Sequence, residues 1–339
     1  MNCVPLDLVI ETQQGIRCEK RSLPIDRVGI YIPAGSAPLF STLMMLAIPA
    51  KIAGCQEIVL CSPPLAATGE IDQTILAVAE LLGVENVFRV GGAQAIAAMA
   101  YGTRTIPKVD KIFGPGNAYV TEAKLQVSID PDGATIDIPA GPSELMIIGD
   151  ENARASFIAA DLLSQAEHDE SSQVILVSNS VNLIRGVQAE VRLQLRNLPR
   201  LEIAERALES CRYILTKDLR AAMEVANAYG PEHLILQTDL AQELAGQVRN
   251  AGSVFVGPWA PESVGDYASG TNHVLPTYGF AKSMSGVGVE SFMKNIFYQE
   301  LTAQGLKELG PSVELRAGHE KLFAHQNAVT LRLRELEGL

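Results

Sequence analysis

Short β-rich runs alternate with segments of helical periodicity along most of this chain, and that alternation limits the folds open to it. The runs VGIYIPA (28–34), EIVLCSPP (57–64) and ELMIIGD (144–150) are apolar, and each is followed by a stretch whose apolar residues recur at helical spacing. Such a succession is typical of βα units around a mostly parallel sheet. Because 339 residues exceed what one hydrophobic core usually covers, we expect two βα domains.

The two ends of the chain depart from this pattern. Residues 1–27 hold one short β-like run, LDLVIE, and no helix before the first βα unit. Beyond Val289 the alternation stops, and residues 290–339 have helical periodicity with few strand candidates. We therefore expect a helical C-terminal extension after the two βα domains.

The composition excludes several classes of protein. Hydrophobic residues make up 47% and charged residues 19%, which excludes disorder as the main state. The net charge is −12, and no run of Lys and Arg supplies the basic face that a nucleic-acid binder needs. Five scattered cysteines form no CxxC pair, which favours free thiols in a reducing compartment over disulfides or a cysteine zinc site. They are Cys3, Cys18, Cys55, Cys61 and Cys211.

The sequence carries no recognisable export or membrane segment. Its start, MNCVPLDLVIETQQG, lacks the basic and long apolar regions of a signal peptide. The longest apolar stretch, residues 39–50, is interrupted by Ser41, Thr42 and Pro49 and is too short to cross a bilayer. We expect a soluble, cytoplasmic protein.

Glycine-rich turns precede two of the expected helices. Gly91-Gly92 comes before AQAIAAMA, and Gly114-Pro115-Gly116-Asn117 comes before AYVTEAKLQV. Glycines there let a ligand approach the backbone, and a helix N-terminus favours a phosphate. Neither turn is a complete GxGxxG, so each is either a cofactor site or only a tight βα turn.

Two short segments place possible catalytic or metal-binding side chains together. Gln165 and His168, three residues apart in SQAEH, share one face of a helix end, which suits two metal ligands or a polar end whose histidine caps the dipole. In GPEHLI, Glu232 and His233 stand at the entrance to an apolar strand. A histidine beside a carboxylate is either a general base or an ordinary exposed loop residue.

The segment GDYASGTNHVLPT (265–277) is a long, polar, glycine-bearing stretch after a strand, and such loops are usually functional or disordered. Asp266 could bind a metal there, and His273 could hydrogen-bond a ligand. In the tail, Glu320 and His325 are remote in sequence from these groups and, taken alone, are typical of surface residues.

Nine segments, taken together and in this order, resemble the histidinol dehydrogenase family. They cover the chain from about residue 20 to about residue 335 and are IYIPAGSAPLFST, VGGAQAIAA, KIFGPGNAYVTEAK, DIPAGPSE, DLLSQAEH, YGPEHLI, AGSVFVG, GDYASGTNHVLPT and HQNAVTLR.

The resemblance implies an activity, cofactors and residue roles. It implies oxidation of L-histidinol to L-histidine through L-histidinaldehyde, the last step of histidine biosynthesis, with two NAD reduced and one Zn²⁺ per subunit. His233 matches the general base that takes the hydroxyl proton as hydride leaves, and Glu232 matches the residue that activates water on the aldehyde.

The resemblance also assigns binding positions. The implied zinc ligands are Gln165, His168, Asp266 and His325. The implied substrate-binding residues are Ser143, Gln165, His168, His233, Asp266, His273, Glu320 and His325. The implied NAD-binding residues are Tyr31, Gln94 and Asn117.

For the fold, the resemblance implies two incomplete Rossmann-like parallel-sheet domains with a helical C-terminal extension, which would explain the missing glycine fingerprint. Residues 1–30 plus 143–287 would form the first domain, on the substrate and zinc side, and residues 31–142 the second, on the NAD side. Residues 288–339 would reach the neighbouring subunit of a homodimer, where His325 and Glu320 complete the partner's active site.

The family continues upstream of the position that matches Met1 with a mostly helical stretch, so we expect an N-terminally shortened relative whose first domain lacks its N-terminal part. Two other interpretations stay open. One is a shortened, inactive homologue that only dimerises or binds metal. The other is a zinc hydrolase, because two His, an Asp and a neighbouring Glu can also activate water.

Overall fold

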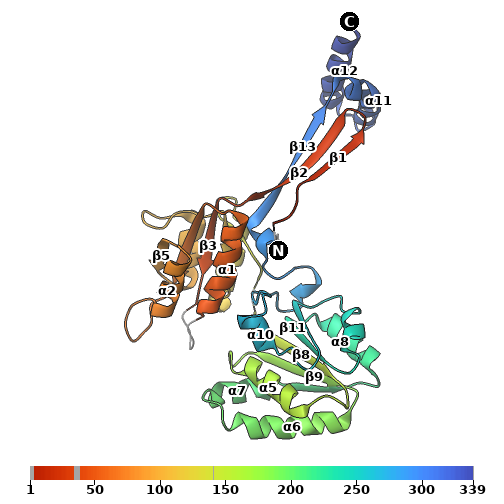
Figure 1. Cartoon of the computed structure of the whole chain (residues 1–339). Coiled ribbons are helices and arrows are strands. Elements are labelled where there is room, and N and C mark those ends of the chain that lie inside the picture. The colour runs from red at the N-terminus through yellow and green to blue at the C-terminus, as the bar shows by residue number, and fades with distance from the viewer. Residues whose placement is uncertain (1–3, 34–38, 140, 339) are drawn as a thin grey trace. The chain divides into compact units, whose positions relative to one another are not determined.

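The computed structural model describes residues 4–33, 39–139 and 141–338 and divides the chain into two compact units (Figure 1). The larger unit is Ile25–Phe292, and the smaller combines the segment up to Pro24 with the segment from Met293 onward. Cys3, and the part of the IYIPAGSAPLFST motif at residues 34–38, lie outside the described residues. No helix in the described ranges is long and apolar enough to span a membrane.

The larger unit contains two parallel five-stranded sheets. In the first the order is β5-β4-β3-β6-β7, with α1 (Phe40–Ala53), α2 (Gln73–Leu81), α3 (Gly92–Tyr101) and α4 (Ala118–Ile129) as connections. Its strands are β3 (Arg27–Tyr31), β4 (Glu57–Ser62), β5 (Asn86–Arg89), β6 (Lys111–Phe113) and β7 (Thr135–Ile136).

The second sheet has the order β10-β9-β8-β11-β12. Its strands are β8 (Glu144–Gly149), β9 (Gln173–Ser178), β10 (Arg212–Leu215), β11 (His233–Gln237) and β12 (Ser253–Val256). Its helices are α5 (Ala155–Ala166), α6 (Val181–Leu195), α7 (Leu201–Glu209), α8 (Leu219–Tyr229), α9 (Ala241–Ala245) and α10 (Glu262–Tyr267). Short 3-10 turns follow at η1 (Phe280–Lys282) and η2 (Val289–Phe292).

Both sheets start from their first strand, extend to one side with the second and third, and then continue on the other side with the fourth and fifth. This order, 3-2-1-4-5, is that of a Rossmann fold without its sixth strand, so the predicted pair of incomplete Rossmann-like sheets is confirmed. The strands fit this role because they are apolar on both faces. Ile147 packs in a core with α5 and α6 residues, whereas Met146 and Ile148 pack in another with α8 residues.

The smaller unit differs from the expected helical extension. It is an antiparallel sheet of order β1-β2-β13, formed by β1 (Leu8–Gln13), β2 (Ile16–Pro24) and β13 (Met293–Leu301), followed by α11 (Ala303–His319) and α12 (Phe323–Glu337). The expectation that residues 288–339 are helical is therefore wrong for 293–301. Because β13 pairs with all nine residues of β2, residues 16–24 belong to this unit and not to a domain with 143–287.

A second boundary also needs correction. Residues 27–30, expected in a domain with 143–287, belong to β3, which lies at the centre of the first sheet between β4 and β6. Strand β3 is almost wholly buried, and its parallel pairing on both sides fixes it there.

Candidate active site

A cavity of about 150 Å³ lies where the carboxyl ends of the first sheet face the amino ends of the second. Gly114 and Asp137 border it from the first sheet, and Ser143, Glu232 and His233 border it from the second. His168, Asp266 and His273 also line it. A larger depression of about 440 Å³, at the carboxyl ends of β8 and β9, contains no histidine and none of the predicted site residues.

His233 is the first residue of β11 and is only 4% exposed, so it is not a loop residue on the surface. Its Nδ1 lies 3.2 Å from the Glu144 carbonyl oxygen, an arrangement in which Nδ1–H donates and Nε2 keeps its lone pair. Nε2 has no hydrogen-bond partner among the described residues. Burial lowers the pKa of His233 to about 3, so the imidazole is neutral at pH 7 and able to accept a proton.

Glu232 precedes β11 and is buried beside the histidine. Its Oε2 accepts a hydrogen bond of 2.8 Å from the Glu144 backbone N–H and lies 3.7 Å from His233 Nδ1. The main chain of Glu144 therefore positions both residues, with its N–H on one and its carbonyl on the other. Burial raises the pKa of Glu232 well above its ordinary value, which makes it a stronger base than an exposed carboxylate.

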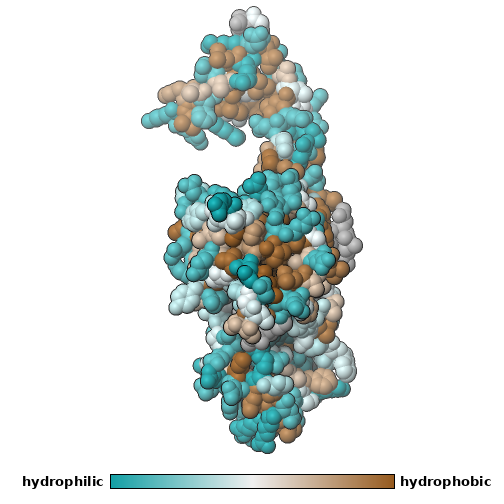
Figure 2. Space-filling model, turned by 90° about the vertical axis from the view of Figure 1, so that its left-hand side faces the viewer, coloured by the Kyte–Doolittle hydropathy of each residue, from teal (hydrophilic) through white to brown (hydrophobic). Residues whose placement is uncertain are grey.

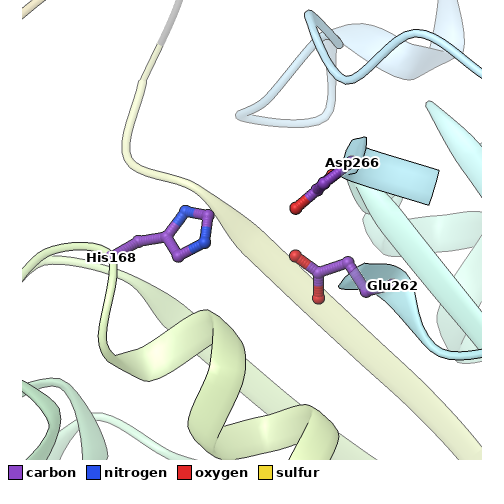
Figure 3. A group of neighbouring side chains, drawn as sticks. All are labelled: His168, Glu262 and Asp266. Atoms are coloured by element: carbon purple, nitrogen blue, oxygen red, sulfur yellow. The ribbon is translucent and has the colours of Figure 1, made fainter. Parts of the chain in front are cut away.

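Three side chains form a group suited to a metal ion (Figure 3). One ligand atom each from His168, Glu262 and Asp266 can be chosen so that all lie within 4.8 Å of one another. Glu262 and Asp266 come from α10, four residues apart and so on one face, and both point towards His168, which follows α5. Asp266 Oδ1 also lies 3.9 Å from His233 Nε2, which places the group beside the unpaired imidazole nitrogen.

Gln165, three residues before His168, has an unpaired amide. Its side chain is fully buried in α5, and neither its oxygen nor its nitrogen has a hydrogen-bond partner among the described residues. Buried polar atoms are rarely left without a partner. Helix α5 ends at Ala166, so His168 lies in the turn after it, where it is exposed, and the predicted placement of both residues on one face of a helix end is wrong for His168.

The cavity lies among several buried acidic side chains. Burial raises the pKa of Asp266 to about 6 and that of Asp161, on α5, to about 7, and it raises the pKa of the glutamates in the same direction. The glutamates are Glu144, Glu232 and Glu262. Such groups favour a cation, because a nearby positive charge offsets the cost of ionising a buried carboxylate. With imidazole and carboxylate donors and the orphaned Gln165 amide, the residues fit a zinc ion.

Two other predicted substrate residues border the same cavity. His273 lies with its Nδ1 4.0 Å from Asp266 Oδ1, and its Nε2 is buried without a partner in the described structure. Ser143, the residue before β8, also lines the cavity. Asp266 itself is on α10, so the polar segment 265–277 begins as a helix and becomes irregular after Tyr267.

The predicted cofactor residues lie at the carboxyl ends of the first sheet. Tyr31 ends β3, and its buried hydroxyl accepts a hydrogen bond of 3.1 Å from the Gly92 N–H. Asn117 caps α4 by accepting from the Val120 N–H at 3.1 Å. Gln94 is exposed in the first turn of α3. Glycine turns at this sheet edge are where Rossmann-like folds bind nucleotides.

Glu320 and His325 belong to the smaller unit. Glu320 caps the C-terminal end of α11, and His325 is in the first turn of α12. Both side chains are exposed.

Sequence reasoning missed two residues of the site. Glu262 is 1% exposed, and its Oε1 lies 3.7 Å from His233 Nδ1. The sequence does carry a signal for it, because an acid four residues before Asp266 would share one face of a helix with that residue. Glu144 is the first residue of an apolar strand, so nothing in its sequence context indicated a role in the site.

Comparisons with known proteins agree on one family. The family model described as histidinol dehydrogenase matches residues 4–333. A histidinol dehydrogenase of Escherichia coli K12 is 56% identical over 333 residues, covering 98% of this chain and 75% of the relative. One from Yersinia pestis is 57% identical over 327 residues, or 96% of this chain and 73% of the relative.

Solved structures give the same result. The crystal structure of histidinol dehydrogenase from Elizabethkingia anophelis matches with a TM-score of 0.95 and 48% identity, covering 98% of this chain and 76% of that one. An acetylating aldehyde dehydrogenase from Geobacillus thermoglucosidasius matches with a TM-score of 0.56 at 14% identity, over 86% of this chain and 78% of that one. The latter likeness shows a shared fold alone.

Proposed function

The chain belongs to the histidinol dehydrogenase family and is an oxidoreductase of histidine biosynthesis, and we propose that it oxidises L-histidinol to L-histidine through L-histidinaldehyde, with two NAD reduced and one zinc ion per subunit. The observation that carries this proposal is the buried, neutral His233, whose unpaired Nε2 lies beside a metal-binding group. The comparisons favour this dehydrogenase over a zinc hydrolase.

In the first oxidation, His233 acts as the general base. Its Nε2 accepts the proton of the substrate hydroxyl, the electron pair of the O–H bond forms the aldehyde carbonyl, and the electron pair of the carbinol C–H bond leaves with the hydride. The Nδ1–H bond to the Glu144 carbonyl fixes the ring orientation and stabilises the imidazolium that results. NAD, when bound, accepts the hydride released in each of the two oxidations.

In the second oxidation, Glu232 acts on water. Its buried carboxylate takes a proton from a water molecule that adds to the aldehyde carbon, which gives the hydrate. The hydrate then loses a hydride and a proton to give the carboxylic acid. The Glu144 N–H bond to Oε2 restricts Glu232 to an orientation beside His233.

For the metal, we propose Gln165, His168 and Asp266 as ligands, with His325 of the partner subunit as the fourth. Zinc, when bound, would hold the substrate's imidazole and amino nitrogens and so position the hydroxyl for proton removal. Glu262 adds a carboxylate within reach of the same point. His273 and Ser143 would bind the substrate, together with Glu320 of the partner subunit.

For the cofactor, we propose the carboxyl edge of the first sheet, with Tyr31, Gln94 and Asn117 as contacts. Three features support this site. Gly92 and Gly114 have no side chain to keep a ligand from the backbone, α3 and α4 begin at these turns, and Gly114 lines the same cavity as His233. This leaves the second sheet for the substrate and the metal.

We further propose a homodimer in the cytoplasm. The smaller unit exposes large apolar side chains, among them Leu315, Phe323 and Leu331 on α11 and α12, and Figure 2 shows brown apolar atoms on its surface. Such patches are typical of surfaces that dock against protein. The exposed Glu320 and His325 are on the same unit. Free thiols at Cys18, Cys55, Cys61 and Cys211 are consistent with a reducing compartment.

The proposal is tested by the yield of NADH. Purified chain, freed of metal and then loaded with zinc, is mixed with limiting L-histidinol and excess NAD. Two NADH per histidinol, lost with a chelator and restored by zinc, is the expected result. No NADH with all components present would contradict the proposal, and one NADH per histidinol would contradict the second oxidation.

A further inference from the structure

A buried ion pair lies behind the glycine turn that borders the cavity. Lys124 on α4 and Asp137 after β7 have side chains that are 2% and 1% exposed, and their charged groups are in contact. The Lys124 ammonium also donates to the Gly114 carbonyl at 2.9 Å and to the Ile138 carbonyl at 3.2 Å. All three of its N–H groups therefore have acceptors.

The pair holds Gly114 by both of its main-chain polar groups. The carbonyl accepts from Lys124, and the N–H donates to the second Asp137 oxygen at 2.8 Å. Gly114 has a φ of 121°, and a Cβ there would lie 2.1 Å from the Tyr31 carbonyl oxygen. The turn is thus fixed in a conformation that only glycine adopts easily, in close contact with the end of β3.

Through Tyr31, this contact also reaches the glycine turn at Gly92, on the same side of the sheet. Tyr31, against which Gly114 packs, accepts the Gly92 N–H at its hydroxyl. The ion pair, Gly114, Tyr31 and Gly92 therefore form one connected set at the carboxyl ends of β6, β3 and β5. The proposed NAD contacts Tyr31, Gln94 and Asn117 are in or next to these turns.

Stability alone gives a weak reason for this arrangement. Removing two charges from water costs as much as their attraction returns in many proteins, and well-packed apolar side chains of similar volume are often at least as stable. The position of the pair offers another reason, because Gly114, Pro115 and Asp137 line the cavity that holds His233. A shift of this turn would move the cavity wall.

We propose that Lys124 and Asp137 are positioning residues that hold the Gly114–Asn117 turn in its cofactor-binding conformation and thereby set the affinity for NAD(H). Neither side chain contacts the cofactor in this account. The inference rests on the proposed function, since it assumes that NAD binds at this sheet edge.

The test separates positioning from stability. We would compare Lys124→Met, Asp137→Leu and the double variant with the wild-type chain by thermal unfolding and by NADH titration without substrate. Each single variant leaves an unpaired buried charge and should lower the midpoint of unfolding. The double variant should recover most of that loss, yet bind NADH at least about tenfold more weakly. Its KM for NAD should rise more than its KM for histidinol.

Lys124→Gln provides a milder change, because its amide retains two of the three donor groups, and it should give an intermediate NADH affinity. Lys108→Met is the matched control. That variant also removes a hydrogen bond from a lysine to a carbonyl near the first sheet, the bond from Lys108 to Asp132 at 2.7 Å. Neither residue lines the cavity, so this variant should bind NADH normally.

A double variant that binds NADH with wild-type affinity would overturn the inference, whether or not its stability also recovers. Absence of NADH binding by the wild-type chain would contradict the proposed function and this inference with it. Normal binding by wild-type and double variant alike would contradict this inference alone.

Discussion

At the scale of single residues, the chemistry depends on how burial prepares His233. The imidazole is surrounded by protein, donates from Nδ1 to a carbonyl, and keeps Nε2 free. We predict that His233→Asn, whose amide can still donate to that carbonyl, lowers kcat by about 10²–10⁴ while leaving the KM for histidinol nearly unchanged. Steady-state kinetics measures both constants. A variant with normal kcat would remove the proposed base.

Glu232 gives a prediction of a different kind, because it is assigned to the second oxidation alone. In Glu232→Gln the amide still accepts from the Glu144 N–H but cannot take a proton from water. Oxidation of added L-histidinaldehyde should therefore slow by about 10²-fold or more, whereas formation of the first NADH from histidinol changes much less. Single-turnover kinetics separates the two steps. Equal slowing of both would contradict the assignment.

Asp161 links the buried acids to stability. Its folded-state pKa of about 7 exceeds the ordinary value of 3.8, so the folded chain binds a proton more readily, and its contribution to stability is lost as pH rises between about pH 4 and pH 7. We predict that Asp161→Asn raises the unfolding free energy of the metal-free chain by up to about 4 kcal/mol at pH 8 and changes it little at pH 4. Urea unfolding at both pH values checks this. An equal change at both would contradict the burial effect.

The sequence identified Glu232 and His233 as a pair, but their burial depends on residues far away in the chain. The contacts that orient them come from Glu144, which pairs with the start of β11 only after β8 and β11 align. Glu262 was missed for the same reason. It belongs to the metal-binding group only because it faces His168, which is almost a hundred residues earlier in the sequence.

At the scale of elements, α10 presents two carboxylates, Glu262 and Asp266, to His168 (Figure 3). Because Asp266 faces His168 and Glu262, loss of its charge should weaken metal binding directly. We predict that Asp266→Asn raises the zinc Kd at least about tenfold without loss of folding. Competition with a chromogenic chelator measures the Kd. Asp239→Asn, which changes an acid at the opposite edge of the second sheet, is the control, and an equal effect there would contradict the assigned site.

The elements themselves were predictable where burial leaves a pattern. Strands such as β8 and β9, buried on both faces, appear in the sequence as continuous apolar runs. Strand β13, MKNIFYQEL, exposes nearly every side chain, so neither alternation nor an apolar run marked it. Its pairing with β2 joins segments about 270 residues apart, and no local signal encodes such pairing.

At the scale of the whole molecule, the proposed site needs two copies of the chain. His233 is in the larger unit, and the exposed His325 is in the smaller one. We predict that His233→Asn and His325→Asn homodimers, each nearly inactive, regain about a quarter of wild-type activity after mixing and subunit exchange, because half of the dimers then contain one intact site. Activity after mixing is the measurement. Activity that stays at the level of the separate variants would contradict a shared site.

The domain boundaries show the limit of sequence reasoning at this scale. The resemblance implied that residues 1–30 join residues 143–287 in one βα domain, whereas the segment up to Pro24 belongs to the smaller unit, to which the chain returns at Met293 after both parallel sheets. The family resemblance supplied the two Rossmann-like sheets, but only the long-range pairing of β2 with β13 defines where one unit ends.

The central claim is that one metal ion binds beside His233, between Asp266 and His168. Anomalous diffraction at the zinc edge, from crystals of the zinc-loaded chain, tests it most directly. The account predicts one strong peak per chain within bonding distance of Gln165, His168 and Asp266, with His325 of the partner subunit completing the ligands. A zinc ion bound elsewhere, or a cavity without a peak in zinc-loaded crystals, would contradict it.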